Sequence, residues 1–289
     1  MKCLIDADIL AYEVSSSGTY KDQDTGETVV KDFERVAELF DQRIKEIEGE
    51  CWATEPSTLY LTGDSTLGKS INRRLKYSGE EEVVFKKNFR ESVAWSKPYK
   101  GQRKEEKPFH FHNLREYMLD NYHVIISNGV EADDLIAAEL VKAGDKLDVI
   151  CCSRDKDLRT IGGMHFGWPC GLQPQFGPER ITEFGYLELD LEGKKLKGGG
   201  QAFLYAQMLT GDRVDNIPGL KNYGKKKAYN ALKNCMSLED LEVSVKNLYI
   251  EAYGDKYKFY YDEQLTLLSL LKELPEGSYY EVQPDFIQS

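Results

Sequence analysis

Four short apolar segments, each closely followed by acidic residues, constrain the fold of this chain more than any other feature. They are residues 2–5, 57–62, 124–127 and 147–153. Their lengths and compositions are those of buried strands. Segments such as 32–47 and 131–143 lie between them and have apolar residues at spacings of three and four, which is typical of helices. This alternation predicts an α/β fold with a mainly parallel sheet flanked by helices.

The composition changes near Gly198-Gly199-Gly200, where we expect a boundary between a first region, 1–198, and a second region, 199–289. In the second region the pattern predicts helices near 201–209, 224–233, 238–253 and 259–271. In the first region, residues 86–107 are basic and are expected to form an arch-like segment over the sheet, and residues 19–30 favour a small hairpin.

Composition and charge exclude several classes of protein. A net charge of −11 argues against a protein that coats nucleic acid through bulk positive charge. No apolar run approaches the ~18 residues of a spanning helix, and Asp6 interrupts the first one too early for a signal peptide, so we expect a cytoplasmic protein. Six cysteines without a Cys-x-x-Cys pair, beside four histidines, predict reduced buried thiols and argue against zinc, which leaves carboxylates as metal ligands.

Acidic residues gather at five places, at the ends of predicted strands or in turns. They are Asp6 with Asp8; Asp64; Glu131 with Asp133 and Asp134; Asp155 with Asp157; and Asp212 with Asp215. The carboxyl ends of parallel strands share one edge of a sheet, so most of these clusters are expected to converge there. Carboxylates that crowd together raise one another's pKa, and hard divalent cations relieve that repulsion. Two adjacent ions are a common arrangement for hydrolysing phosphodiesters.

Each acidic cluster also has an ordinary structural explanation. The acids at 131–134 could favour the positive end of a helix dipole, and Asp155 and Asp157 could cap a helix. Asp215, which precedes Asn216, could belong to a turn. The metal site is therefore favoured by the set of clusters and not by any one of them.

Two basic elements could bind phosphate. The first is Tyr99-Lys100-Gly101-Gln102-Arg103, where Lys100 and Arg103 could hold a phosphate and Tyr99 could stack on a base, unless the segment is simply a solvated charge run. The second lies between Gly219 and Ala228, where a glycine-shaped loop leads into a predicted helix. It contributes Gly219, Gly224, Lys225, Lys226 and Lys227, the pattern of a helix-hairpin-helix element that grips a DNA backbone without reading its sequence.

Taken in order, these motifs resemble the flap endonuclease family of 5′-nucleases, including bacteriophage 5′-3′ exonucleases and the nuclease domain of bacterial DNA polymerase I. The matching residues are Ile5-Asp6-Ala7, Thr62-Gly63-Asp64, Tyr99-Lys100-Gly101-Gln102-Arg103, Gly129-Val130-Glu131-Ala132-Asp133-Asp134, Ser153-Arg154-Asp155-Lys156-Asp157 and Gly211-Asp212-Arg213-Val214-Asp215-Asn216-Ile217-Pro218-Gly219. The resemblance runs from residue 4 to about 235, and a further similar stretch begins at Gln264.

The resemblance implies a PIN-like, Rossmann-like sheet, and a helical region with a helix-three-turn-helix element for binding DNA. It implies two Mg²⁺ or Mn²⁺ ions, the first held by Asp6, Asp64, Glu131 and Asp133, and the second by Asp155, Asp157 and Asp212, with support from Asp134 and Asp215. Lys100 and Arg103 would engage the scissile phosphate. In relatives the loop that corresponds to Gly219–Gly224 can also bind K⁺.

The activity implied is 5′-3′ exonuclease and structure-selective flap endonuclease cleavage in phage or bacterial DNA replication, repair or degradation. The expected partners are DNA with 5′ ends, flaps or nicks and RNA/DNA hybrids, with no membrane and with the chain as a monomer. The sequence departs from the family pattern at Asn222-Tyr223, where the loop commonly has Gly-Ile, and in an insertion near 66–86. The alternatives are a phosphatase of the haloacid-dehalogenase type, an RNA nuclease of the PIN group and a catalytically inert DNA-binding protein.

Overall fold

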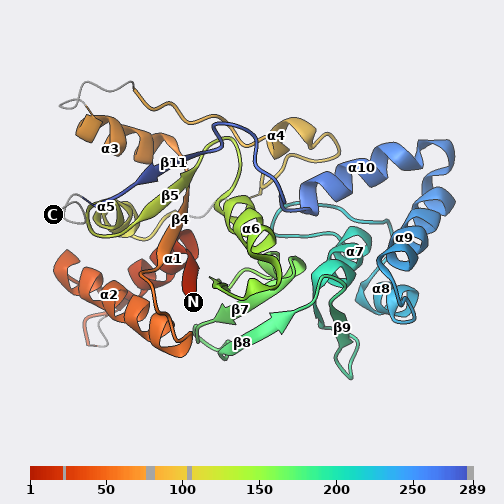
Figure 1. The fold of residues 1–289 in the computed structure, drawn as a ribbon, viewed down its shortest axis with the longest axis horizontal. Helices are drawn as coiled ribbons and strands as arrows, with labels where there is room; N and C mark the ends of the chain where they lie inside the picture. Colours follow the sequence, from red (N-terminus) through yellow and green to blue (C-terminus); the bar gives the residue numbers. More distant parts are fainter. Residues whose placement is uncertain (22–23, 76–81, 103–105, 285–289) are drawn as a thin grey trace.

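The computed structural model describes residues 1–21, 24–75, 82–102 and 106–284 and contains an α/β core beside a helical region (Figure 1). The strands of the main sheet are β1 (Lys2–Asp6), β4 (Thr58–Thr62), β5 (Val124–Ser127), β6 (Val149–Cys152), β7 (Gly163–Gly167), β8 (Phe176–Ile181) and β11 (Tyr279–Val282). They are ordered β11-β5-β4-β1-β6-β7-β8. The five inner strands are parallel, and β8 and β11 run antiparallel at the two edges. The predicted mainly parallel sheet is confirmed.

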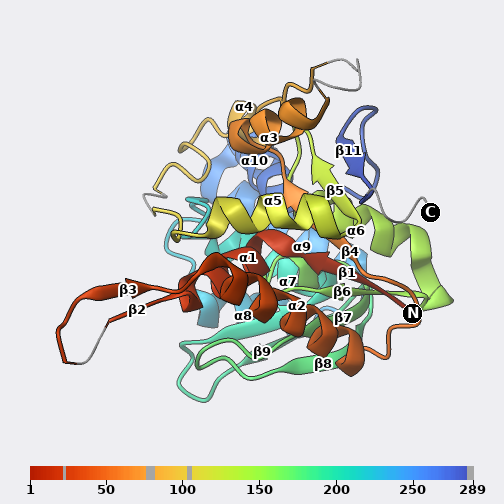
Figure 2. The same ribbon diagram turned by 90° about the vertical axis from the view of Figure 1, so that its left-hand side faces the viewer.

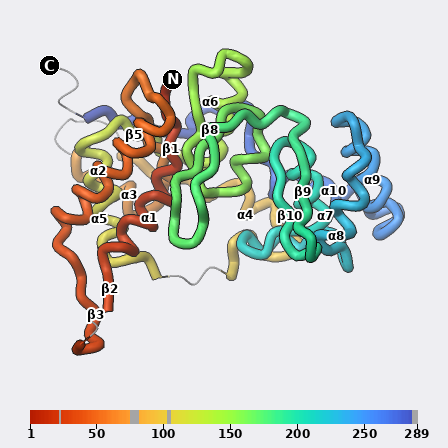
Figure 3. Tube along the Cα trace, turned by 90° about the horizontal axis from the view of Figure 1, so that it is seen from below, coloured from red at the N-terminus to blue at the C-terminus, as the bar shows by residue number. Residues whose placement is uncertain are grey.

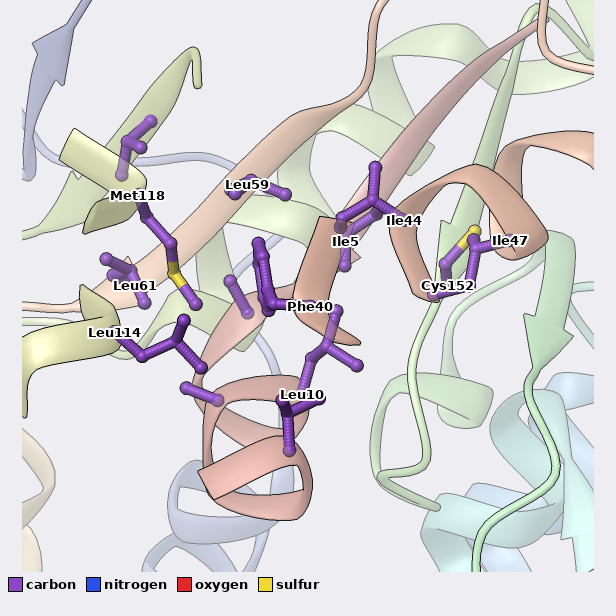
Figure 4. Packing of buried hydrophobic residues seen from close by; sticks show 14 of the residues in the cluster. Ile5, Leu10, Phe40, Ile44, Ile47, Leu59, Leu61, Leu114, Met118 and Cys152 are labelled. Carbon is purple, nitrogen blue, oxygen red and sulfur yellow. The ribbon is translucent and has the colours of Figure 1, made fainter. Parts of the chain in front are cut away.

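Helices cover both faces of the sheet. On one face lie α1 (Ala7–Ser17), α2 (Phe33–Glu50) and α5 (Phe111–Asn121), and on the other lies α6 (Ala132–Ala143). Because successive strand residues point to opposite faces, Ile5 packs with the first group of helices and Leu4 with α6. Figure 4 shows the first of these cores, in which Phe40 and Ile44 come from the apolar face of α2.

The remaining elements surround this core. The shorter ones are α3 (Ser65–Leu75), α4 (Arg90–Val93), the paired strands β9 (Tyr186–Leu189) and β10 (Leu196–Gly199), and 3-10 helices at Gly144–Lys146, Leu158–Thr160 and Gly254–Lys256. The predicted hairpin is confirmed by β2 (Thr19–Lys21) and β3 (Thr28–Val30), which project away from the core (Figures 2 and 3). None of the described helices is long and apolar enough to cross a membrane.

The helical region carries the predicted helices as α7 (Gly200–Thr210), α8 (Lys225–Leu232), α9 (Leu238–Tyr253) and α10 (Tyr257–Leu268). They share a second apolar core, in which the Tyr249 hydroxyl of α9 donates a hydrogen bond to the Met208 carbonyl of α7 at 2.7 Å. Ser237 and Asp240 form a capping box that fixes the start of α9. These helices lie together at one side of the sheet (Figure 1).

Two features of the fold differ from the expectations. Strands β7 to β10 were not predicted, because their sequences are polar or glycine-rich and lack the apolar runs of the inner strands. The chain also returns to the sheet after α10, where β11 pairs with β5. The expected second region, 199–289, is therefore not wholly helical, and its boundary falls inside the β9–β10 hairpin.

Candidate functional site

The first acidic group consists of three carboxylates at the carboxyl edge of the sheet, of which Asp6 is buried and Asp133 and Asp155 are partly buried. Asp6 ends β1, Asp133 lies in the first turn of α6 and Asp155 follows β6. Burial raises the pKa of Asp6 to about 7, with further contributions from Asp8 and Asp155. Burial, followed by the charges of Asp6 and Asp155, raises the pKa of Asp133 well above its usual value. Three acids from three different elements are thus close enough to oppose one another's ionisation.

The second acidic group surrounds Lys156. Its ammonium lies 3.1 Å from Asp157 Oδ1 and also contacts Asp212. Burial and the neighbouring charge of Asp155 raise the pKa of Asp157 to about 6. Burial alone would raise the pKa of Asp212 too, but the contact with Lys156 keeps it below its usual value. Gln207 of α7 donates a hydrogen bond to Asp157 and so attaches the helical region to this group.

The basic segment meets the acids at Tyr99 and Lys100. The Lys100 ammonium contacts Glu131 and lies 3.9 Å from Asp215 Oδ2. The Tyr99 hydroxyl lies 3.1 Å from Glu131 Oε2 and 3.1 Å from Asp215 Oδ2. The Lys100 backbone N–H donates to the Asp215 carbonyl at 3.0 Å. The Tyr99 hydroxyl and the Lys100 backbone thus hold the basic segment against the acids, while the Tyr99 side chain is half-buried. Stacking of Tyr99 on a base stays a prediction. Arg103 lies outside the described residues.

These two acidic groups suit hard divalent cations by the chemistry of their donors. They offer carboxylate oxygens, the ligands that such ions prefer, and the pKa values of several of these acids are raised by burial and by their acidic neighbours. Among the described residues, the ammonium group of Lys100 contacts Glu131 and that of Lys156 contacts Asp157. In the described part of the chain, no three carboxylates bring oxygens within 4.8 Å of one another.

Asp64, just after β4, is held by two backbone groups and by an arginine. One of its oxygens accepts hydrogen bonds at 2.9 Å from the backbone N–H groups of Thr66 and Leu67, which caps α3. The other contacts the guanidinium of Arg115, a buried residue of α5 whose Nε also lies 3.3 Å from Asp8 Oδ1. Arg115 holds the pKa of Asp64 below its usual value, although burial acts in the opposite direction. No local sequence pattern points to Arg115, because Asp64 and Asp8 are more than 50 residues away from it.

Asp134, which we expected to support the metals, has a structural role instead. Both of its oxygens lie 2.7 Å from the guanidinium nitrogens of Arg90, and both side chains are fully buried. The carboxylate also accepts the backbone N–H groups of Glu131 and Leu271 at 2.9 and 3.0 Å. The Asp134 carboxylate oxygens thus accept hydrogen bonds from the start of α6, from α4 and from the turn after α10. We therefore do not include Asp134 among the candidate metal ligands.

Helix α10 holds two functional segments through adjacent side chains. Glu263 accepts the backbone N–H groups of Trp95 and Ser96 at 2.9 and 2.7 Å, just before the Tyr99-Lys100 contact with the acids. Gln264 accepts the N–H of Gly219 at 2.9 Å, at the start of the glycine-shaped loop. Both side chains are buried. One rigid helix therefore sets the spacing between the basic segment and the loop.

The loop places three lysines together on the surface. Gly219 has φ 65° and packs so closely against Gly211 that a side chain at either position would clash with backbone. Asn222 supplies a left-handed conformation, φ 63°, where the family loop has glycine. Gly224 then caps α8, whose first turn presents Lys225, Lys226 and Lys227 to solvent. Exposed backbone N–H groups and ammonium groups at one helix start can bind phosphate.

Several known proteins resemble this chain in sequence. No family model matches the chain. Among curated proteins, it is 31% identical over 191 residues to a 5′-3′ exonuclease of Buchnera aphidicola and 30% identical over 191 residues to a 5′-3′ exonuclease of Mycoplasmopsis pulmonis. These matches cover 60% and 62% of this chain but 57% and 60% of the relatives, so the chain spans about three fifths of their length. DNA polymerase I of Bacillus subtilis is 28% identical over 207 residues, which is 62% of this chain and 21% of the polymerase.

Solved structures show the same fold. A T5 protein co-crystallised with metal ions has a TM-score of 0.55 and 18% identity and covers 93% of this chain and 89% of its own. The T5 5′-exonuclease with bound zinc has a TM-score of 0.51 and 16% identity and covers 93% of this chain and 100% of its own. The expected α/β fold with a mainly parallel sheet is confirmed, and the curated matches confirm a resemblance to 5′-3′ exonucleases.

The Arg90–Asp134 pair gives a prediction about stability. Asp134→Ala should lower the free energy of unfolding by about 3–5 kcal/mol, because it leaves a buried guanidinium without its counter-charge. Asp120→Ala, which removes the exposed partner of Arg74, should change it little. Urea denaturation of both variants provides the measurement. A similar, small loss in the two would show that the buried pair does not hold these elements together.

Hydrogen exchange can test the contacts of Glu263 and Gln264 independently. Glu263→Gln should speed exchange of the Trp95 and Ser96 amides by about tenfold or more, since bonds to a charged acceptor contribute about 1.5–3 kcal/mol. The Gly219 amide should remain protected in that variant and lose protection in Gln264→Leu. Asp262→Asn, one position away and exposed, should alter none of the three. Equal loss at all three amides in every variant would contradict separate anchoring.

Proposed function

We propose that this chain is a divalent-metal-dependent 5′-3′ exonuclease that also cleaves DNA flaps. The observation that carries the proposal is the convergence of Asp6, Asp133 and Asp155 at one edge of the sheet, next to a lysine that contacts Glu131. The similarity to curated 5′-3′ exonucleases supports it. The proposed ions are Mg²⁺ or Mn²⁺, and the proposed substrates are DNA with 5′ ends, flaps or nicks and RNA/DNA hybrids, bound by a monomer.

The acids divide naturally between two ions. Asp6, Glu131 and Asp133 would hold the first, near the ends of β1 and β4. Asp155, Asp157 and Asp212 would hold the second, with Asp215 beside it. When bound, such ions supply an activated water and neutralise the charge of the phosphate and the leaving oxygen. Asp64 would join the first set only after releasing Arg115, which makes it the weakest of the sequence-based assignments.

Two lysines offset part of the negative charge of the acidic groups. Lys100 and Lys156 neutralise part of the acidic charge while no other cation is bound. Lys100 would contact a phosphate oxygen of the substrate, where its ammonium would stabilise the charge that develops during cleavage. The hydrogen bonds of Tyr99 and of the Lys100 backbone keep this ammonium close to Glu131 and Asp215.

The lysines of α8 are suited to binding the DNA backbone away from the site of cleavage. Lys225, Lys226 and Lys227 lie in the first turn of the helix, so they contact phosphates without reading bases. Because α10 fixes the loop that precedes α8 relative to the basic segment, the grip sets the position of the duplex at the acids. We also propose K⁺ as a ligand of the 219–224 loop, since Asn222 preserves a left-handed turn there.

The decisive test is cleavage of 5′-labelled flap, nicked, duplex and RNA/DNA hybrid substrates in Mg²⁺ and in EDTA. Asp155→Asn should lower the rate by at least about a thousandfold and leave DNA binding intact, because it removes a ligand charge but no DNA contact. Asp145→Asn, an exposed acid at the opposite end of α6 from Asp133, serves as the control. Binding without any turnover by the unmodified chain would favour the inert DNA-binding alternative.

The grip can be tested through salt dependence. Lys226→Ala should weaken DNA binding and reduce the slope of log K against log [salt] by about one, because one fewer phosphate is neutralised. Lys45→Ala, an exposed lysine on α2, should leave affinity and slope unchanged. Fluorescence anisotropy between 50 and 200 mM salt, a range chosen to resolve such slopes, gives both values. An unchanged slope for Lys226→Ala would remove α8 from the interface.

A further inference from the structure

Three cysteines that the proposed nuclease does not use meet inside the core. Cys3 lies in β1, Cys51 caps the carboxyl end of α2 and Cys152 lies in β6. All three are fully buried, and their sulphurs lie within 4.8 Å of one another, with 3.7 Å between Cys51 and Cys152. Figure 4 shows Cys152 within the cluster that also contains Ile47 of α2.

A fourth fully buried cysteine, Cys151, does not join the other three. Cys151 is adjacent to Cys152 in β6, but it points to the opposite face of the sheet and packs in the α6 core. Cys3 and Cys152, by contrast, share the α2 face as diagonal neighbours on paired parallel strands, since Cys152 is opposite Ile5 and Cys3 is opposite Ile150. Cys51 then reaches the same point from α2. Three elements thus direct a thiol to one place.

The spacing of the sulphurs suits a thiolate-bound ion. A Zn–S bond of about 2.3 Å in a tetrahedral site separates neighbouring sulphurs by about 3.8 Å, close to the 3.7 Å between Cys51 and Cys152. The thiols also interact electrostatically: hydrogen bonds from Cys152 and Cys51 lower the pKa of Cys3, and burial raises the pKa of Cys152. The amino terminus of the chain adds a positive charge that favours a Cys3 thiolate.

We propose that Cys3, Cys51 and Cys152 form a structural site for one thiophilic metal ion of the Zn²⁺ and Cd²⁺ class, separate from the acidic site. Each thiol that binds the ion releases its proton to solvent, so binding strengthens with pH. Ser57 lies within hydrogen-bonding reach of Cys3, and its hydroxyl donates a hydrogen bond to Glu48 at 2.6 Å.

Such an ion would join β1, α2 and β6 at one point. These elements are separated by up to about 150 residues of chain. Strand β1 also carries Asp6 at its carboxyl end, and Cys152, the last residue of β6, lies three positions before Asp155. The ion would therefore stabilise the core that positions the acids without taking part in their chemistry. The acids prefer hard ions and the thiols soft ones, so the two sites are selective for different metals.

The experiment is a Cd²⁺ titration of the reduced, metal-free chain, in excess Mg²⁺ to occupy the acidic site. Cys170 and Cys235, which are partly exposed, are first replaced by serine in all samples. The ultraviolet charge-transfer band of cadmium thiolate should grow to one equivalent, with a rise in Tm. Cys51→Ala should lose both the band and the rise. Cys151→Ala, equally buried on the same strand, should keep both.

Cadmium NMR of the unmodified core cysteines keeps the test decisive if Cys51→Ala does not fold. A resonance typical of a three-sulphur environment supports the site. No thiolate band in the chain with all three cysteines, or an undiminished band in folded Cys51→Ala, overturns it. Because neither readout depends on cleavage, failure of this proposal and failure of the proposed nuclease are separate outcomes.

Discussion

The repulsion between buried carboxylates is the constraint on which the rest of this structure depends. Parallel strands bring Asp6 and Asp155 to one edge, and α6 adds Asp133 there, so folding gathers like charges that oppose one another. The chain tolerates this repulsion because Lys100 and Lys156 contact the acids. The buried ion pair between Arg90 and Asp134 also holds α6 in place beside them. Charge that destabilises the fold locally is the same charge that makes the edge suitable for divalent cations.

Helix α10 gives the acidic edge a fixed relation to the rest of the molecule. Arg90 donates hydrogen bonds to carbonyl groups at its end, at Leu267 and Ser269, while Glu263 and Gln264 hold the basic segment and the glycine-shaped loop. These contacts are buried and largely to backbone groups, so they depend little on the identity of the residues they hold. Buried contacts of α10 therefore fix the distance between the lysines of α8 and the acids.

Features that depend on neighbouring residues in the sequence could be predicted, whereas contacts between residues far apart in the sequence could not. Inner strands and helices such as 32–47 were predictable because their apolar periodicity is local, and the acids because they follow those strands. The partners of Asp64 and Asp134 were not, because Arg115 and Arg90 reach them from other elements. The contacts of Tyr99 were not predictable for the same reason, since its hydroxyl lies next to two carboxylates that are distant in the sequence. The meeting of Cys3, Cys51 and Cys152 likewise has no local sequence pattern.

The pairing of β11 with β5 has a consequence for how the chain reaches its native state. Val124 is opposite Val282, so the last strand of the sheet forms only after more than 150 intervening residues are available. Contacts of such sequence separation close slowly, since the ordering cost of a long loop precedes any gain. During synthesis β5 therefore remains an open edge until the helical region has emerged. The sheet is sealed last by the segment that follows α10, which makes assembly of the helices a condition for completing the core.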